Sequence, residues 1–238
     1  MIRAVFFDVD FTLIYPGQAF QAVGYHRFCA DHGIVVDPDR FDAAVAAAAT
    51  AFEGPQATVY TDEVWVRYTR CIIEGMGGQG ETLDQCARQI YGEWASNHHF
   101  ELYDDTVASL AALSAGGFRI GLISNSHRCL VSFQEHFELQ HLISGAVSSA
   151  AHGAMKPHPS IFQSAMRLVG TEPHESVMVG DSVAHDIDGA LSAGMRAVFL
   201  RRGDQPHPRE GELTESGVSI IRSLHELQGV LAPPRPRP

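Results

Sequence analysis

Two aspartates stand two residues apart at the end of the first apolar run of the chain. In the stretch AVFFDVDFTLI (residues 4–14), the apolar run leads directly to Asp8, and a second carboxylate follows at Asp10. A carboxylate can act as a nucleophile, and a neighbouring carboxyl group can move protons as a general acid and base. The spacing therefore indicates a pair of acids with two different chemical tasks.

Polar side chains also follow three later apolar runs, at the points where the predicted strands end. They are Ser124 and Asn125 at the end of the GLIS run, Lys156 in the loop beyond the strand at 143–148, and Asp181 and Asp186 after the VMVG run. In open parallel sheets, ligands bind beyond the carboxyl ends of the strands. We therefore expect these side chains to meet the first acid pair at one edge of a sheet.

If the electrophile at such an edge were a phosphate dianion, a carboxylate that attacks it would have to overcome electrostatic repulsion. Two unit charges about 4 Å apart interact by roughly 4 kcal/mol at an effective dielectric constant of about 20, and a dianion doubles that energy. The charge of Lys156 alone would barely offset this repulsion, so a divalent cation is needed. Mg²⁺ binds few carboxylates, retained waters and substrate oxygens, and Asp8 and Asp181 could provide the carboxylates.

Buried strands that alternate with helices supply the elements for such an edge. The sequence predicts strands at 2–8, 118–124, 143–148, 176–180, 195–200 and 217–221. Helices are expected between most of them, including one at 104–115 that ends at Gly116 and Gly117. This alternation is typical of a doubly wound α/β fold with a parallel sheet covered on both faces.

The segment from about 16 to 97 has a different, helical character. Its four predicted helices cover 18–32, the alanine-rich stretch that begins at Asp37, residues 61–76 and residues 81–96. We therefore predict an α/β core domain formed by residues 1–15 and 98–231, with a four-helix domain inserted at 16–97. Residues 232–238 are rich in proline, and we expect them to be disordered or extended.

Composition restricts the partners. The 238 residues are 45% hydrophobic and 19% charged, and the formal net charge is −11. This charge argues against nucleic acid or an anionic membrane as the main partner. Transmembrane and signal-peptide patterns are lacking, and the four cysteines are widely spaced. We expect a cytoplasmic monomer or homodimer with reduced thiols that acts on a small molecule.

Four motifs, taken in order, resemble those of the haloacid dehalogenase-like (HAD) superfamily, in the branch with a helical cap inserted after the first motif (subfamily IA type). The motifs are D-x-D-x-T at Asp8, Asp10 and Thr12, a Ser at Ser124, a Lys at Lys156, and G-D-S-x-x-x-D with Asp181 and Asp186. The resemblance covers nearly the whole chain. It implies an Mg²⁺-dependent phosphatase that hydrolyses a small phosphorylated metabolite through an aspartyl-phosphate.

The resemblance also implies a role for each motif residue. Asp8 would be the nucleophile and a metal ligand, and Asp10 would serve as general acid and base while its backbone carbonyl ligates the metal. Thr12 would position the loop, and Ser124, with Asn125 beside it, would bind the phosphoryl group. Lys156 would neutralise charge. Asp181 would bind Mg²⁺, and Asp186 would act directly or through water and Lys156.

Two positions depart from the usual pattern. Phe11 stands where many relatives have Gly, and we expect its side chain to fill space towards the cap. His158 stands where an Asp often occurs, and no mechanism is attached to it. The stripe Trp65, Tyr68 and Ile72 is interpreted as cap core rather than as a ligand platform. For His127 and Arg128, a place in the cleft and a place on the surface stay equally open.

Other activities of the same fold also stay open. A 2-haloacid dehalogenase would not need the second acid at Asp10, whereas a phosphomutase would keep both aspartates. A non-catalytic binding protein would not need the complete set of motif residues that is present here.

Overall fold

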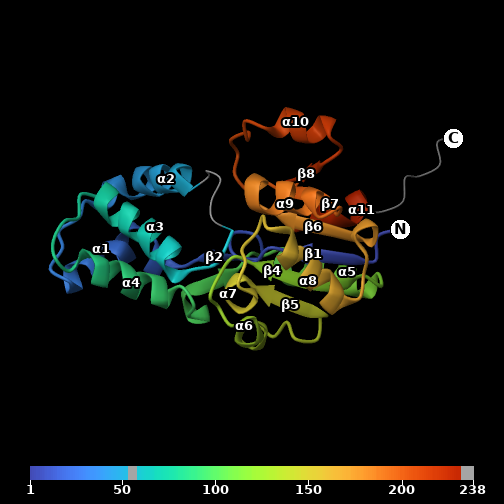
Figure 1. Cartoon of the computed structure of the whole chain (residues 1–238), viewed down its shortest axis with the longest axis horizontal. Helices are drawn as coiled ribbons and strands as arrows, with labels where there is room; N and C mark the ends of the chain where they lie inside the picture. Colours follow the sequence, from blue (N-terminus) through green and yellow to red (C-terminus); the bar gives the residue numbers. More distant parts are fainter. Residues whose placement is uncertain (53–57, 232–238) are drawn as a thin grey trace.

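The central element of the structure, a computed structural model that describes residues 1–52 and 58–231, is a six-stranded parallel sheet (Figure 1). Its strands lie in the order β5-β4-β1-β6-β7-β8. Their bounds are β1 (Ala4–Phe7), β4 (Arg119–Ser124), β5 (Gly145–Ser148), β6 (Ser176–Gly180), β7 (Arg196–Leu200) and β8 (Ser219–Ile221). The six predicted strands are confirmed, and no predicted end differs from the observed one by more than two residues.

The side chains of β1 point alternately into two apolar cores. Val5 and Phe7 belong to one buried cluster, while Ala4 and Phe6 belong to the other. Since successive side chains of a strand point to opposite faces, both faces of the sheet must be covered. The first core includes residues of α5 (Thr106–Ala115), α6 (Leu130–His136) and α11 (Leu227–Leu231). The second includes residues of α8 (Pro159–Val169), α9 (Asp188–Ser192) and α10 (Glu210–Glu215). The predicted doubly wound α/β fold is confirmed.

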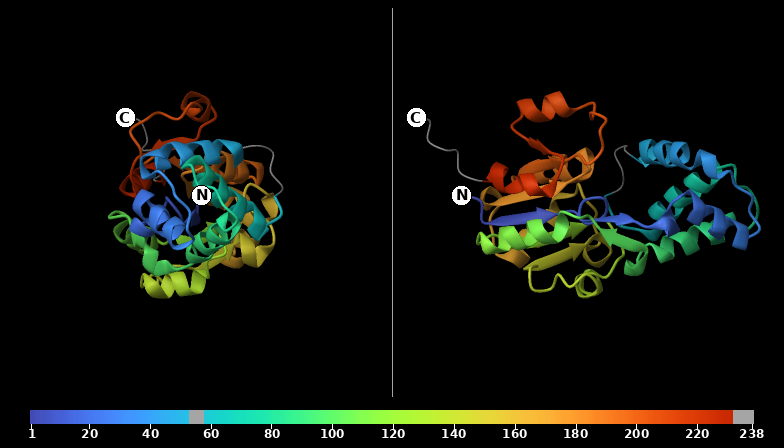
Figure 2. Two further views of the ribbon diagram at one scale, coloured as in Figure 1. Left: turned by 90° about the vertical axis from the view of Figure 1, so that its left-hand side faces the viewer. Right: turned by 180° about the vertical axis from the view of Figure 1, so that it is seen from behind.

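Four further helices lie beyond one end of the sheet, on the side opposite to the N-terminus (Figure 2). They are α1 (Ala22–Asp31), α2 (Phe41–Phe52), α3 (Asp62–Gly75) and α4 (Leu83–Glu93). The capping residues from which these helices were predicted lie at their N-terminal ends. Asp37 accepts a hydrogen bond from the backbone N–H of Asp39, with Pro38 between them, and Thr61 is the N-cap of α3. Val66, Ile72 and Ile73 of α3 are buried.

The chain passes between the sheet and these helices through a short antiparallel ribbon. Strand β2 (Ile14–Pro16) pairs with β3 (Phe100–Leu102), and the hydroxyl of Tyr15 donates a hydrogen bond of 2.7 Å to Glu101 Oε2. The sequence did not predict this ribbon, because three-residue strands leave no detectable alternation. The predicted boundaries at residues 15 and 98 lie beside it.

Short elements complete the described chain. They are α7 (Ser149–His152), the 3₁₀ turns η1 (Gln18–Phe20), η2 (Pro38–Arg40), η3 (Asn97–His99), η4 (Pro173–Glu175) and η6 (Leu224–Glu226), and the π-helical turn η5 (Val183–Ile187). Across residues 1–52 and 58–231, no helix has both the length and the apolar character needed to cross a membrane. The proline-rich segment 232–238 lies outside the described residues.

Candidate active site

Three motif residues meet at the carboxyl end of β1. The ammonium group of Lys156 donates hydrogen bonds to Asp8 Oδ1 at 2.5 Å, to Asp186 Oδ1 at 2.6 Å and to the carbonyl of Ile123 at 2.9 Å. All three charged side chains are buried. Because β1 lies between β4 and β6, the residue that follows it stands at the centre of the sheet edge, as predicted.

The turn after β6 holds Asp186 close to this group. The backbone N–H of Ser182 donates to Asp186 Oδ2 at 3.0 Å, so both oxygens of this carboxylate already have partners. A Cβ atom on Gly180 would lie 2.2 Å from Asp186 Oδ2, so only glycine allows the close approach. The geometry thus favours the predicted role of Asp186 through Lys156 over direct binding of a metal.

The carboxylates outnumber the cation. Ligand oxygens of Asp8, Asp181 and Asp186 lie within 4.8 Å of one another, and the hydroxyl of Thr12 donates to Asp181 Oδ1 at 3.5 Å. Three carboxylates and one ammonium leave two negative charges without compensation. Hard oxygen donors with this excess charge suit a divalent cation such as Mg²⁺. Asp8 and Asp181 are the carboxylates with oxygens left to bind it.

Burial and charge shift the pKa values of this group. Burial raises the pKa of Asp8 to about 6, although the attraction of Lys156 opposes the rise. Burial, followed by repulsion from Asp8, raises the pKa of Asp181. For Lys156, burial acts to lower the pKa, but the attraction of Asp186 and Asp8 outweighs it and the pKa rises. Lys156 therefore keeps its proton at neutral pH.

The second acid has a cation of its own. Arg128 Nη2 donates to Asp10 Oδ1 at 2.9 Å, and the guanidinium group lies 4.0 Å from the centre of the Phe100 ring. Arg128 also donates to the carbonyl of Trp94 and to Asn97 Oδ1. Its exposed fraction is only 1%, so the surface alternative is wrong. Burial raises the pKa of Asp10, and the charge of Arg128 opposes that rise.

Ser124, which was predicted to bind the phosphoryl group, is placed differently from expectation, whereas Asn125 lines the cavity. Ser124 is fully buried, and its hydroxyl lies 2.9 Å from that of Ser126. Ser126 lines the cavity described below, whereas the structure does not place Ser124 on that wall. Fully buried Thr12 is likewise not on the wall and instead contacts Asp181. The side chain of Ser124, the last residue of β4, is enclosed between the elements that pack on that strand.

Asn125 positions Lys156. The side-chain amide of Asn125 donates to the carbonyl of Lys156 at 2.9 Å, and its oxygen accepts from the N–H of Lys156 at 2.7 Å. This two-bond pairing fixes the backbone from which the ammonium group extends. His158, two residues further on, accepts a hydrogen bond from the N–H of Ser160 through Nδ1 and so caps α8. An Asp at this position could serve the same function.

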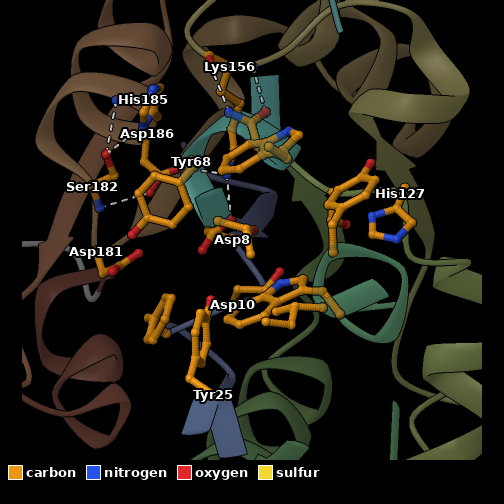
Figure 3. A pocket seen from close by; sticks show the side chains of 18 residues that line it. Asp8, Asp10, Tyr25, Tyr68, His127, Lys156, Asp181, Ser182, His185 and Asp186 are labelled. Atoms are coloured by element: carbon orange, nitrogen blue, oxygen red, sulfur yellow. Dashed lines mark hydrogen bonds and ion pairs between the residues drawn. The ribbon is translucent and has the colours of Figure 1, made fainter. Parts of the chain in front are cut away.

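A cavity of about 210 Å³ lies between the carboxylates and the helices beyond the sheet (Figure 3). The sheet side contributes the charged residues and Asn125, Ser126, His127, Ser182 and His185. The helical side contributes Tyr25, Trp65, Tyr68, Thr69, Ile90, Tyr91 and Trp94. Trp65 and Tyr68, which were interpreted as core, are only partly buried and line the cavity, although Tyr68 also packs against the core as expected. Ile72 is buried as expected. Helical periodicity shows which face is apolar but not whether it meets protein or a cavity.

Two loop residues join this wall. Phe11 lies with its ring 6.3 Å from that of Trp94, so it extends towards the helices as expected. Its φ of 62° is in the left-handed region, which explains why glycine suits this position. The ring of His127 lies 4.1 Å from that of Tyr91, and burial lowers its pKa. Of the two positions left open for His127, the structure shows the one in the cavity.

Comparison with known proteins agrees with this arrangement. The family model of haloacid dehalogenase-like hydrolases matches residues 2–194. Glyceraldehyde 3-phosphate phosphatase from Methanothermobacter thermautotrophicus is 31% identical over 95% of this chain and 100% of its own length. Phosphoserine phosphatase from Thermus thermophilus is 33% identical over 60% of this chain, and the match spans 57% of that protein.

A solved structure of a magnesium-bound HAD-hydrolase from Bacillus subtilis shares the fold. It superposes with a TM-score of 0.73 over 98% of this chain and 99% of its own, at 21% identity. Motifs, fold and family match agree, and the chain belongs to the haloacid dehalogenase-like hydrolases.

Proposed function

We propose that the chain is an Mg²⁺-dependent phosphatase that hydrolyses a small phosphate monoester through an aspartyl-phosphate on Asp8. The observation that carries this proposal is the pair of acids in one cavity, each with a different cation. Asp8 is held by Lys156, and Asp10 is held by Arg128. Separate environments for two neighbouring acids are what a nucleophile and a proton donor require.

In the first step, a carboxylate oxygen of Asp8 attacks phosphorus while the bond to the leaving oxygen breaks. Asp10 gives its proton to that oxygen, so the organic group departs as an alcohol. In the second step, Asp10 takes a proton from water, the water oxygen attacks the aspartyl-phosphate, and Asp8 is regenerated with release of phosphate. Lys156 offsets negative charge on Asp8 and on the phosphoryl group throughout.

Asp8 and Asp181 would hold the magnesium ion, with the backbone carbonyl of Asp10 as a further ligand. The ion would supply the positive charge at the phosphoryl oxygens that one lysine cannot. Two observations support its presence in the active enzyme. The three carboxylates carry uncompensated charge, and the related Bacillus subtilis structure is bound to magnesium.

Residues 16–97 would act as a cap over the core formed by residues 1–15 and 98–231. The aromatic side chains of α1, α3 and α4 on the cavity wall support this division, since they stand opposite the carboxylates. Movement of such a cap would admit substrate and then exclude water. The names of the two phosphatase relatives support a phosphate ester as substrate.

Two other activities compete with this proposal. A dehalogenase would not need Asp10 or its ion pair, so the contact with Arg128 favours the phosphatase. A phosphomutase would transfer the phosphoryl group from Asp8 to a sugar rather than to water. Phosphate release from p-nitrophenyl phosphate with Mg²⁺, its loss in Asp8→Asn, and the absence of halide release from 2-chloropropionate would support the phosphatase. Halide release would overturn it.

A further inference from the structure

The cap side of the cavity is a wall of rings without charge. Among residues 16–52 and 58–97, those that line the cavity are Tyr25, Trp65, Tyr68, Thr69, Ile90, Tyr91 and Trp94. None of them is an acid, a lysine or an arginine. The charged residues of the cavity all come from the sheet side, where the phosphoryl group would bind. The organic part of a substrate would therefore meet aromatic faces.

Contacts with neighbouring groups hold these rings in place. The Trp94 ring lies 4.5 Å from that of Phe20 and 5.1 Å from that of Phe100. The rings of Trp65 and Tyr68 meet edge to face with their centres 6.2 Å apart. A wall of fixed rings is prepared to bind a flat group without first losing side-chain freedom.

The hydroxyl groups on this wall are already engaged. Tyr91 donates a hydrogen bond of 2.8 Å to Asp62 Oδ1 and also meets the hydroxyl of Tyr60. Tyr25 is hydrogen-bonded to Thr69.

The indole N–H of Trp65 has no hydrogen-bond partner among the described residues and is the donor that remains on this wall. A sugar or glycerol group placed here would lose several hydrogen bonds to water and could recover few beyond that one. A carboxylate group would lose still more, since this wall offers no lysine or arginine as partner. A primary ammonium group would lose its hydrogen bonds to water and find ring faces but no acid on this wall, so a cation is the alternative that the test below must separate.

We infer that the organic group of the substrate is an uncharged, planar aromatic ring, and that Trp65 and Tyr68 select it. This inference rests on the proposed phosphatase function and adds the substrate class to it. A cavity of about 150 Å³ is known to hold a benzene molecule, so a volume of about 210 Å³ is enough for a small ring and a phosphoryl group. Phosphoserine and glyceraldehyde 3-phosphate, the substrates in the names of the two relatives, do not have this character.

The test compares esters of primary alcohols, so that the leaving oxygens are chemically alike. We expect kcat/KM for 2-phenylethyl phosphate to exceed the values for glycerol 3-phosphate, phosphoserine and phosphocholine by about tenfold or more. A preference for phosphocholine would mean that the rings bind a cationic group. A preference for glycerol 3-phosphate or phosphoserine would mean that the wall binds polar groups. Either result would overturn the inference but leave the phosphatase standing. Absence of turnover of every ester would overturn both.

Variants of α3 identify the selecting side chains. Trp65→Ala should lower kcat/KM for 2-phenylethyl phosphate about tenfold more than for glycerol 3-phosphate. Trp65→Leu, which keeps apolar bulk, should lower the ratio by a smaller factor. Arg70→Ala is the matched control, because Arg70 is on the same helix and pairs with Glu74 away from the cavity. It should leave the ratio unchanged, and circular dichroism melts should show all three variants folded. An unchanged ratio in folded Trp65→Ala would overturn the assignment.

Discussion

Arg128 donates a hydrogen bond of 2.9 Å to Asp10, although 118 residues separate them in the chain. The same guanidinium group also donates to the carbonyl of Trp94 and to Asn97, just beyond α4. One buried cation thus connects the proposed proton donor to the end of the helical segment. The position of Asp10 therefore depends on how the helices sit on the sheet.

Arg128→Met should misplace Asp10 and so damage the reaction most when the leaving group needs a proton. We expect kcat/KM for 2-phenylethyl phosphate to fall about a hundredfold, the usual size of an acid–base contribution, and that for p-nitrophenyl phosphate to fall much less. Asp10→Asn should show the same substrate dependence. Arg119→Met, at the opposite end of β4, controls for loss of an arginine. Equal losses on both esters would mean that Arg128 supports only the fold.

Asp8→Asn should abolish turnover and preserve the fold, because asparagine keeps the shape of the side chain but lacks the nucleophilic oxygen anion. Activity should fall to less than about one hundredth of the wild-type value. Rapid quenching of the wild-type reaction should trap phosphate bound to protein, and the variant should trap none. Trapped phosphate in Asp8→Asn would place the covalent step on another residue.

Metal removal gives a third prediction. EDTA should eliminate activity, Mg²⁺ should restore it, and Ca²⁺ should restore little, since Ca²⁺ is larger and takes more ligands. Asp181→Asn should raise the Mg²⁺ concentration needed for half-maximal activity. Asp186→Asn should instead lower kcat with a smaller change in that concentration, because both oxygens of Asp186 are engaged by Lys156 and Ser182. Full activity in chelated protein would contradict the metal site.

Asp105 gives a prediction for stability. This buried carboxylate accepts hydrogen bonds from Arg202, from the Ser223 hydroxyl and from the Leu224 N–H. Burial alone would raise its pKa, but these donors outweigh burial and lower it. Asp105→Asn should reduce the free energy of unfolding at pH 7 by about 2–4 kcal/mol.

The pH dependence of that loss follows from the direction of the shift. A pKa below the unfolded value of about 3.9 means that the ionised form stabilises the fold above that pH. This contribution disappears as the pH falls through the lowered pKa of the folded state. Urea unfolding should therefore give the same difference in the free energy of unfolding between wild type and Asp105→Asn at pH 7 and pH 5. The difference should be smaller at pH 3. A constant difference at all three values would contradict the ion-pair explanation.

The sequence was informative where a residue follows directly from its strand. Asp8 and Asp181 directly follow β1 and β6, and they converge because the ends of parallel strands share one edge of the sheet. The alternation of strands and helices predicts that edge, and Lys156 reaches it from the loop beyond β5 and α7. The motifs could not locate the side chain of Ser124 relative to that of Ser126. Ser124 ends β4 and Ser126 follows it, and the orientation of both side chains depends on the packing around that strand.

Other features depend on contacts between distant segments. Arg128 lies four residues after the end of β4, and that spacing left a cleft position and a surface position equally open. The spacing of Trp65 and Tyr68 predicts an apolar face of a helix. It does not predict a cavity beside that face, because periodicity is the same whether the face contacts protein or empty space. The ribbon forms only where the segment that leaves the sheet, β2, lies beside the segment that returns to it, β3. Tertiary structure brings these two segments together, so their sequences alone do not reveal the pairing.

Because of the ribbon, the inserted helical segment can change during evolution while the main sheet stays the same. Pro16 pairs with Phe100, so the chain departs from the core and returns to it at adjacent points. None of the six strands of the main sheet takes a residue from the intervening segment. A lengthened, shortened or exchanged segment could therefore join the core at the same two points without altering the register of the sheet. Substrate preference can diversify in this way while the arrangement of Asp8, Lys156 and Asp186 is inherited intact.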